Sequence, residues 1–267
     1  MSTIKCIMNI YYGVDDRLRK FIDENKNWII PINGGSKLRA LHDAWTNDHL
    51  IFDDSKTPNI SHLNSKLNEM TSLYFAYMHP EILGDAEYVG LCHYRRHFDY
   101  GAVEMAMNSK PDIICAKPII MAFRVGGKIK LGTVEDGYKI CHIPECWDIL
   151  ENKMRTIADG IFWDKWKNLN ILVAPCNMFI MERNLFNAYC EYIFPILFDL
   201  VDKIDLRNVD GYQYRQLAFI SERITSYWIN RYEEVNPGKV YAIDSVYDES
   251  LKPADAKDLR GNFVYEK

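Results

Sequence analysis

The chain lacks most of the short motifs that mark common enzyme classes. Its 267 residues contain no G-x-x-x-x-G-K-[ST] phosphate loop and no G-x-G-x-x-G fingerprint. The sequence therefore lacks the motifs that usually indicate a nucleoside triphosphatase or a common dinucleotide-dependent enzyme. There is no D-x-D triplet either. Asp85-Ala86-Glu87 comes nearest, but it precedes a predicted strand instead of following it, which is the wrong end for contact with a ligand.

Disulfide, zinc, secretion and membrane signals are also missing. The seven cysteines are scattered and include no C-x-x-C pair, so neither a disulfide framework nor a zinc site is expected. The N-terminal run MSTIKCIMNIYY has no signal-peptide core, and a reducing cytoplasm fits the cysteine content. The apolar run 171–181 is far shorter than the roughly 20 residues of a membrane span. We expect a cytoplasmic protein, with peripheral contact at the inner face of the plasma membrane left open.

An excess of positive charge is absent as well. Lys and Arg total 32 against 37 Asp and Glu, a net charge of −5, which argues against nucleic acid as a partner. The 48% of hydrophobic residues can build a full core. With no linker or internal repeat, we expect one domain over residues 1–248 and a charged, loosely ordered tail over 249–267.

The order of predicted elements indicates an α/β fold with a mainly helical C-terminal half. Apolar residues spaced 4, 3, 4 and 3 apart predict one helix from Ser61, with Ser61 as its N-cap. Short apolar runs alternate with helical patterns, as in a sheet buried on both faces. Strands are predicted over Ile4–Tyr12, Trp28–Ile32, Tyr88–Cys92, Asp112–Ala116, Leu172–Met181 and Val240–Ile243.

An unusual cluster of cationic side chains follows the predicted strand Tyr88–Cys92. His93, Arg95 and Arg96 stand within four residues of each other, beside the aromatic Tyr94. In open α/β sheets, ligands bind outside the carboxyl ends of the strands. Arginine holds phosphate oxygens bidentately and stays charged, so this cluster suits a diphosphate. The alternative is a solvated loop without a ligand.

Four polar residues in the second half are further candidates, each with a structural alternative. Asp210 is either a helix N-cap or a base, and Glu222 is either the partner of Arg223 or a base. Asn177 lies in an apolar strand and needs a partner, either the backbone or a substrate. His142 is either a structural histidine or faces a ligand.

Several segments together resemble the bacterial family catalogued as domain of unknown function 4422. Its recurrent pattern is E-L-T-x-L-Y-W-x-W, Y-I-G-L-x-H-Y-R-R-Y-F, N-M-F-I-M, D-x-Y-Q-x-R and S-E-R. The matching segments here are 68–77, 86–98, 176–181, 210–213 and 219–223. Members are regarded as glycosyltransferases of capsular, exopolysaccharide and O-antigen biosynthesis, some of them linked to galactofuranose transfer.

The resemblance implies a single nucleotide-sugar-binding domain of the glycosyltransferase-A type, which is Rossmann-like. His93, Arg95 and Arg96 would then bind the donor diphosphate, and Asp210 and Glu222 are the candidate catalytic carboxylates. The remaining residues expected at the substrate are Glu69, Thr71, Tyr74, Tyr94, His142, Asn177 and Gln213.

The predicted activity is transfer of a sugar from a nucleotide-diphosphate donor, with UDP-galactofuranose or UDP-galactose as candidates, to a hydroxyl of a glycan, expected to be lipid-linked. Arginine would replace the metal, so no cofactor is required, although Mg²⁺ or Mn²⁺ stays open. Two alternatives are a noncatalytic carbohydrate- or nucleotide-binding partner of a polysaccharide synthase and a metal-dependent hydrolase of phosphorylated sugars.

Overall fold

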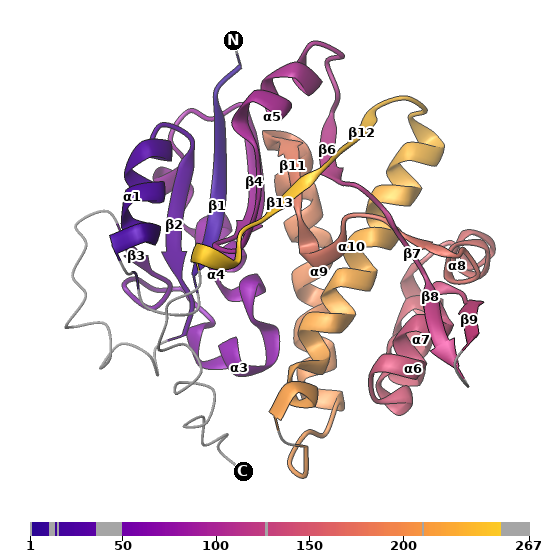
Figure 1. Cartoon of the computed structure of the whole chain (residues 1–267). Helices are drawn as coiled ribbons and strands as arrows, with labels where there is room; N and C mark the ends of the chain where they lie inside the picture. Colours follow the sequence, from indigo (N-terminus) through magenta and orange to yellow (C-terminus); the bar gives the residue numbers. More distant parts are fainter. Residues whose placement is uncertain are drawn as a thin grey trace.

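A mixed central sheet organises the molecule (Figure 1). The computed structural model describes residues 2–10, 14, 16–35, 50–125, 128–209 and 211–251. The main strand order is β12-β6-β11-β4-β1-β2-β3. All neighbours pair in parallel except β11, which runs antiparallel between β4 and β6. The bounds are β1 Ile4–Ile10, β2 Ile29–Asn33, β3 Ile51–Phe52, β4 Tyr88–His93, β6 Ile113–Ala116, β11 Phe179–Glu182 and β12 Val240–Ile243.

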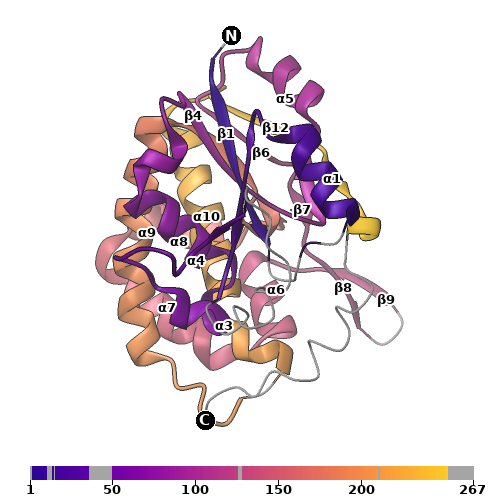
Figure 2. The same cartoon turned by 90° about the vertical axis from the view of Figure 1, so that its left-hand side faces the viewer.

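Both faces of the sheet are covered, which explains the uninterrupted apolar strands. Along β4, Val89 and Leu91 face one core, whereas Tyr88 and Cys92 face the other. Figure 2 shows the smaller layer, α1 Asp16–Asn25 and α5 Tyr100–Met107, on one side of the sheet. The larger layer on the other side contains α4 Glu69–Met78, α9 Arg183–Lys203 and α10 Gln216–Val235.

The C-terminal half is mainly helical, as predicted. Three helices form one group on the side of α10 that faces away from β1 (Figure 1): α6 Val134–Cys141, α7 Pro144–Ile157 and α8 Gly160–Lys167. Thr133 and Asp136 begin α6 with a reciprocal capping box. Two small antiparallel sheets lie beside this group: β7 Ile119–Ile120 with β10 Ile171–Leu172, and β8 Ala122–Val125 with β9 Lys128–Leu131. No helix in the described ranges has the length and apolar character needed to cross a bilayer.

The single helix predicted from Ser61 is wrong, because the backbone breaks twice. The chain forms a 3-10 turn, Ser61–Leu63, then α3 Asn64–Leu67, and then α4. Asn68 separates α3 from α4 with a φ of 47°, a region that asparagine tolerates better than most residues. Ser61 is not an N-cap; its hydroxyl donates to Asp53 at 2.5 Å. The break makes Glu69 the first residue of a separate helix.

The helix for which Asp210 is a candidate N-cap also begins later than that position predicts. Gly211–Arg215 form a 3-10 turn, and α10 starts at Gln216. Asp210 lies outside the described residues, as do residues 252–267 of the predicted tail.

Candidate functional site

The carboxyl end of β4 meets the amino end of β11, because these neighbours are antiparallel. His93 ends β4, and its Nε2 lies 2.7 Å from the carbonyl oxygen of Cys176. Cys176 belongs to a 3-10 turn, Pro175–Asn177, that leads into β11. The predicted diphosphate cluster and the N-M-F-I-M segment are therefore in contact.

The turn that leads into β11 has an unusual backbone. Ala174, Cys176 and Asn177 have φ values of 51°, 59° and 54°. Each left-handed residue other than glycine costs on the order of 1 kcal/mol or more, so the surroundings must hold this conformation. Strain of this kind concentrates at functional sites.

Asn177 is held by three side chains from two helices. Its amide nitrogen donates to Glu69 Oε1 at 2.7 Å and to Ser221 Oγ at 3.0 Å, and its amide oxygen accepts from Thr225 Oγ1 at 2.6 Å. All four residues are buried. The hydrogen bonds of the Asn177 side chain thus run to other side chains, and its bond with Glu69 ties the turn to the first residue of α4.

Glu222 is tied to the same turn. One carboxylate oxygen accepts from the backbone N–H of Cys176, and the other accepts from Nη1 of Arg223. The side chains of Glu222 and Arg223 are 16% and 7% exposed. Arg223 also donates to the carbonyl of Phe219 at 3.2 Å and lies over the Tyr138 ring. The ion-pair alternative for Glu222 is therefore observed.

The two arginines lie in the hairpin that joins β4 to β5 Arg96–Phe98. Arg96 is exposed, and its Nη1 lies 2.8 Å from Cys176 Sγ. Its guanidinium group stacks on Tyr247 of β13 Ser245–Tyr247, the strand that pairs with β5. Arg95 forms an ion pair with Glu249 at 3.3 Å. Both guanidinium groups thus lie at the carboxyl edge, covered in part by the segment that follows β12.

Thr71 belongs to a second polar cluster, at the ends of β1, β2 and β3. Asn64 donates to Thr71 Oγ1 at 2.8 Å, and Ser72 donates to Asn9 Oδ1 at 2.8 Å. Asp53 accepts from the backbone N–H of Gly35 at 3.0 Å, and burial raises the pKa of its carboxyl. Of this cluster the sequence identified only Thr71. Asn9 and Asp53 were missed, although polar side chains at the ends of apolar strands were a usable signal.

His142 and Gln213 lie beside the start of α10. The His142 ring stacks on Phe219 with 3.9 Å between centroids. Burial, together with the positive charges of Arg223 and Arg215, lowers the pKa of His142 to about 3, so the ring is neutral near pH 7. Gln213 donates to the carbonyl of Cys141 at 2.9 Å. The same Arg223 whose charge lowers the pKa of His142 also forms the ion pair with Glu222.

The remaining two candidates, Tyr74 and Tyr94, pack against neighbouring side chains. The Tyr74 ring packs edge-on against Phe194 and Phe198 of α9. Tyr94 is 5% exposed and packs in the smaller core, with the Arg95 guanidinium over its ring at 5.4 Å. It supports Arg95 instead of presenting a free ring.

Within the described part of the chain, no three His, Cys, Asp or Glu side chains gather as a metal centre requires. Cys176 is the thiol nearest the arginines, and burial raises its pKa to about 12, which disfavours a thiolate nucleophile. The polar and charged groups gathered here are the guanidinium groups of Arg95 and Arg96, the His93 ring and the Glu222–Arg223 pair. Such a set can bind and neutralise an anion at the sheet edge.

Comparison with known proteins gives one family and one fold relative. No curated protein matched the sequence. The structure is similar to that described as "WbbM bifunctional glycosytransferase apo structure", with a TM-score of 0.71, 20% identity, and coverage of 93% of this chain. The chain spans 46% of that protein, so the likeness concerns the fold of about half of it. Residues 19–234 match the family model "Domain of unknown function (DUF4422)", and the chain belongs to this family.

Proposed function

We propose that the chain is a glycosyltransferase that moves a sugar from a nucleotide-diphosphate sugar to a hydroxyl of a capsular, exopolysaccharide or O-antigen glycan intermediate. The main support is the convergence of His93, Arg96 and Glu222 on the strained Cys176 turn at the carboxyl edge of the sheet. The shared fold with a bifunctional glycosyltransferase is consistent with this proposal. UDP-galactofuranose and UDP-galactose are the first donors to test.

In the proposed reaction, the bond between the anomeric carbon and the diphosphate oxygen breaks while the acceptor oxygen bonds to that carbon. The nucleoside diphosphate leaves with the bonding electron pair, and Arg95 and Arg96 neutralise its developing charge. The acceptor proton passes to a carboxylate. Asp210 is our candidate base, because both oxygens of Glu222 already hold Cys176 and Arg223. Glu222 then acts as a positioning residue.

Two guanidinium groups supply the charge that a divalent cation supplies in other sites, so we propose that no metal is required. Activity that survives EDTA supports this point. Activity that disappears with EDTA and returns with Mn²⁺ or Mg²⁺ contradicts it and favours the hydrolase alternative. A lipid-linked acceptor at the inner face of the plasma membrane is part of the same proposal.

The direct experiment incubates the protein with a panel of nucleotide sugars and measures the release of nucleoside diphosphate. We expect Arg95→Ala and Arg96→Ala each to lower turnover by about 100-fold, in line with the loss of one transition-state donor. Arg207→Ala is a matched control, because its exposed guanidinium pairs with the neighbouring Asp205. Unchanged rates in both site variants would remove the diphosphate role, and no release with any donor would favour a noncatalytic binding protein.

A further inference from the structure

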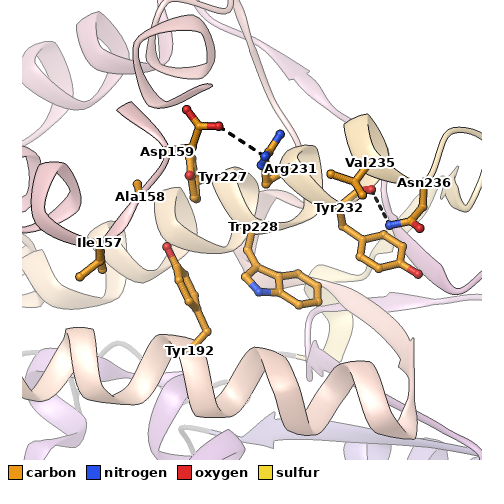
Figure 3. A pocket seen from close by; sticks show the side chains of 10 residues that line it. All are labelled: Ile157, Ala158, Asp159, Tyr192, Tyr227, Trp228, Arg231, Tyr232, Val235 and Asn236. Atoms are coloured by element: carbon orange, nitrogen blue, oxygen red, sulfur yellow. Dashed lines mark hydrogen bonds and ion pairs between the residues drawn. The ribbon is translucent and has the colours of Figure 1, made fainter. Parts of the chain in front are cut away.

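A cavity of about 330 Å³ lies between α9, the C-terminal half of α10 and the junction of α7 with α8 (Figure 3). Tyr192 reaches into it from α9, and Tyr227, Trp228, Arg231 and Tyr232 line it from α10. Its volume is near the lower limit of small-molecule sites, about 300–1,000 Å³. The space therefore suits one small ligand or one unit of a longer chain.

The position of the cavity separates it from the arginine cluster. Tyr232 donates to Asp112 Oδ2 at 2.6 Å, and Asp112 precedes β6. The cavity thus lies toward the amino end of β6, whereas His93 and Arg96 lie at the carboxyl end of parallel β4. Glu222 is six residues before Trp228 on α10, a rise of about 9 Å along the helix axis.

Four of the ten residues that line the cavity are aromatic. Trp228 stacks near-parallel on Tyr232, with 12° between the ring planes, and both rings are partly exposed. Flat, partly wet rings offer dispersion contact to the C–H face of a sugar while leaving its hydroxyl groups free to bond elsewhere. Tyr and Trp faces combined with a few polar groups suit a ligand that is apolar on one face and polar at its edge.

The polar groups in the wall distinguish a sugar from a hydrocarbon. The Tyr192 hydroxyl is shielded from solvent and has no hydrogen-bond partner among the described residues. Asp159 and Arg231 form an ion pair at 3.4 Å on the opposite wall. A hydrocarbon chain would leave the Tyr192 hydroxyl unpaired and would desolvate the Asp159–Arg231 pair without bonding it, which is costly, whereas sugar hydroxyls would pair these groups.

The charges around the cavity are balanced. Glu234 pairs with Lys165 at 2.8 Å and with Arg231 at 3.6 Å, so the rim carries no surplus of positive charge. A phosphate or an anionic lipid surface would need that surplus. The balance favours a neutral ligand.

We propose that this cavity is a second carbohydrate-binding site, which holds one neutral sugar unit of a glycan apart from the arginine cluster. The sugar stacks on Trp228, and its hydroxyl groups bond Tyr192 and the Asp159–Arg231 pair. This proposal goes beyond the proposed function, because the site would bind glycan whether or not the chain transfers sugar.

The test titrates ¹⁵N-labelled protein with methyl β-galactopyranoside, methyl β-galactofuranoside and methyl β-glucopyranoside, and follows the Trp228 indole N–H signal. Trp228→Phe assigns that signal among the six tryptophans. At least one glycoside should shift it with a dissociation constant of about millimolar, typical of a single small unit. Tyr192→Phe should weaken this binding about fivefold, the value of one hydrogen bond.

Tyr77→Phe is the matched control. Tyr77 of α4 packs on Phe194, which lies on the same helix as Tyr192, and Tyr77 does not line the cavity. It should leave the affinity unchanged. Tyr192→Phe removes only an unpaired hydroxyl, so the fold should survive, which the remaining signals report. Absence of any glycoside shift, undiminished binding in Tyr192→Phe, or a response to farnesol alone would overturn the proposal. Nucleotide release is measured separately, so its failure would contradict only the proposed function.

Discussion

At the residue scale, Glu222 and Arg223 stabilise each other in a poorly solvated position. Removal of one charge from such a pair leaves the other buried without a counter-charge, which costs about 3 kcal/mol. We expect Glu222→Gln to lower the free energy of unfolding by about that amount in urea titration. The exposed Glu104→Gln in α5 is the control. A loss no greater than that of the control would show that the pair does not hold the turn.

His142 gives a prediction for acid stability. Its pKa is about 3 in the folded chain and near 6.5 when unfolded, so below pH 6.5 the unfolded chain binds the extra proton. Stability should therefore fall as the pH drops from 6.5 toward 3, by at most about 1.4 kcal/mol per pH unit from this group. His142→Phe keeps a ring on Phe219 and should flatten that slope in urea titrations at successive pH values.

The exposed His62→Phe provides the comparison for His142→Phe. It should leave the acid slope as it is in the parent chain. Equal slopes for the parent chain and His142→Phe would mean that His142 is protonated in the folded state.

At the element scale, β4 and β11 approach so closely that only glycine fits at residue 90. A Cβ there would lie 2.6 Å from both the Phe179 carbonyl oxygen and Ile180 Cγ1. Gly90→Ala should therefore cost about 1–3 kcal/mol through overpacking, measured by thermal or urea unfolding. Gly160→Ala, at the start of α8 with nothing within 4 Å, should instead stabilise by about 0.5–1 kcal/mol. Equal effects would contradict the packing explanation.

Glu249 follows β13 and lies against Arg95, where the proposed diphosphate would bind. A carboxylate there competes with an anionic ligand, so Glu249→Gln should lower the KM for the donor a few-fold without changing kcat. Asp244→Asn is the control, because Asp244 directly precedes β13 and pairs with Lys117 instead of with an arginine of the site. A raised KM in Glu249→Gln would show that Glu249 instead assists donor binding.

Local pattern predicted most strands of the main strand order, although the predicted strand Leu172–Met181 is broken by the turn Pro175–Asn177 before β11. The strand Val240–Ile243 has the predicted bounds. The strand Tyr88–Cys92 is buried on both faces, and the predicted cluster of His93, Arg95 and Arg96 begins where it ends. The break at Asn68 was not predicted, because a single left-handed residue leaves the helical spacing of its neighbours unchanged. Likewise, the spacing placed Tyr74 on a helix but could not show that its face packs on α9.

At the scale of the whole molecule, the α/β class and the mainly helical second half followed from the order of elements. Most of the candidate site could not be predicted from that order. The turn depends on contacts of Cys176 with His93 and Glu222, 83 and 46 positions away, and on the contact of Asn177 with Glu69, 108 positions away. Local spacing carries no information on such contacts, so the roles of Asn177 and Glu222 as supports of the turn emerged only from the fold.

The proposed function depends above all on a nucleoside diphosphate that binds at the carboxyl edge of β4, against the two arginines. The most direct measurement is a crystal structure of the chain with UDP. We predict the diphosphate within hydrogen-bonding distance of Arg95 or Arg96, beside the turn at Cys176, with Glu249 displaced. A diphosphate bound elsewhere, with both guanidinium groups still engaged by β13 and Glu249, would show that the arginines do not form the donor site.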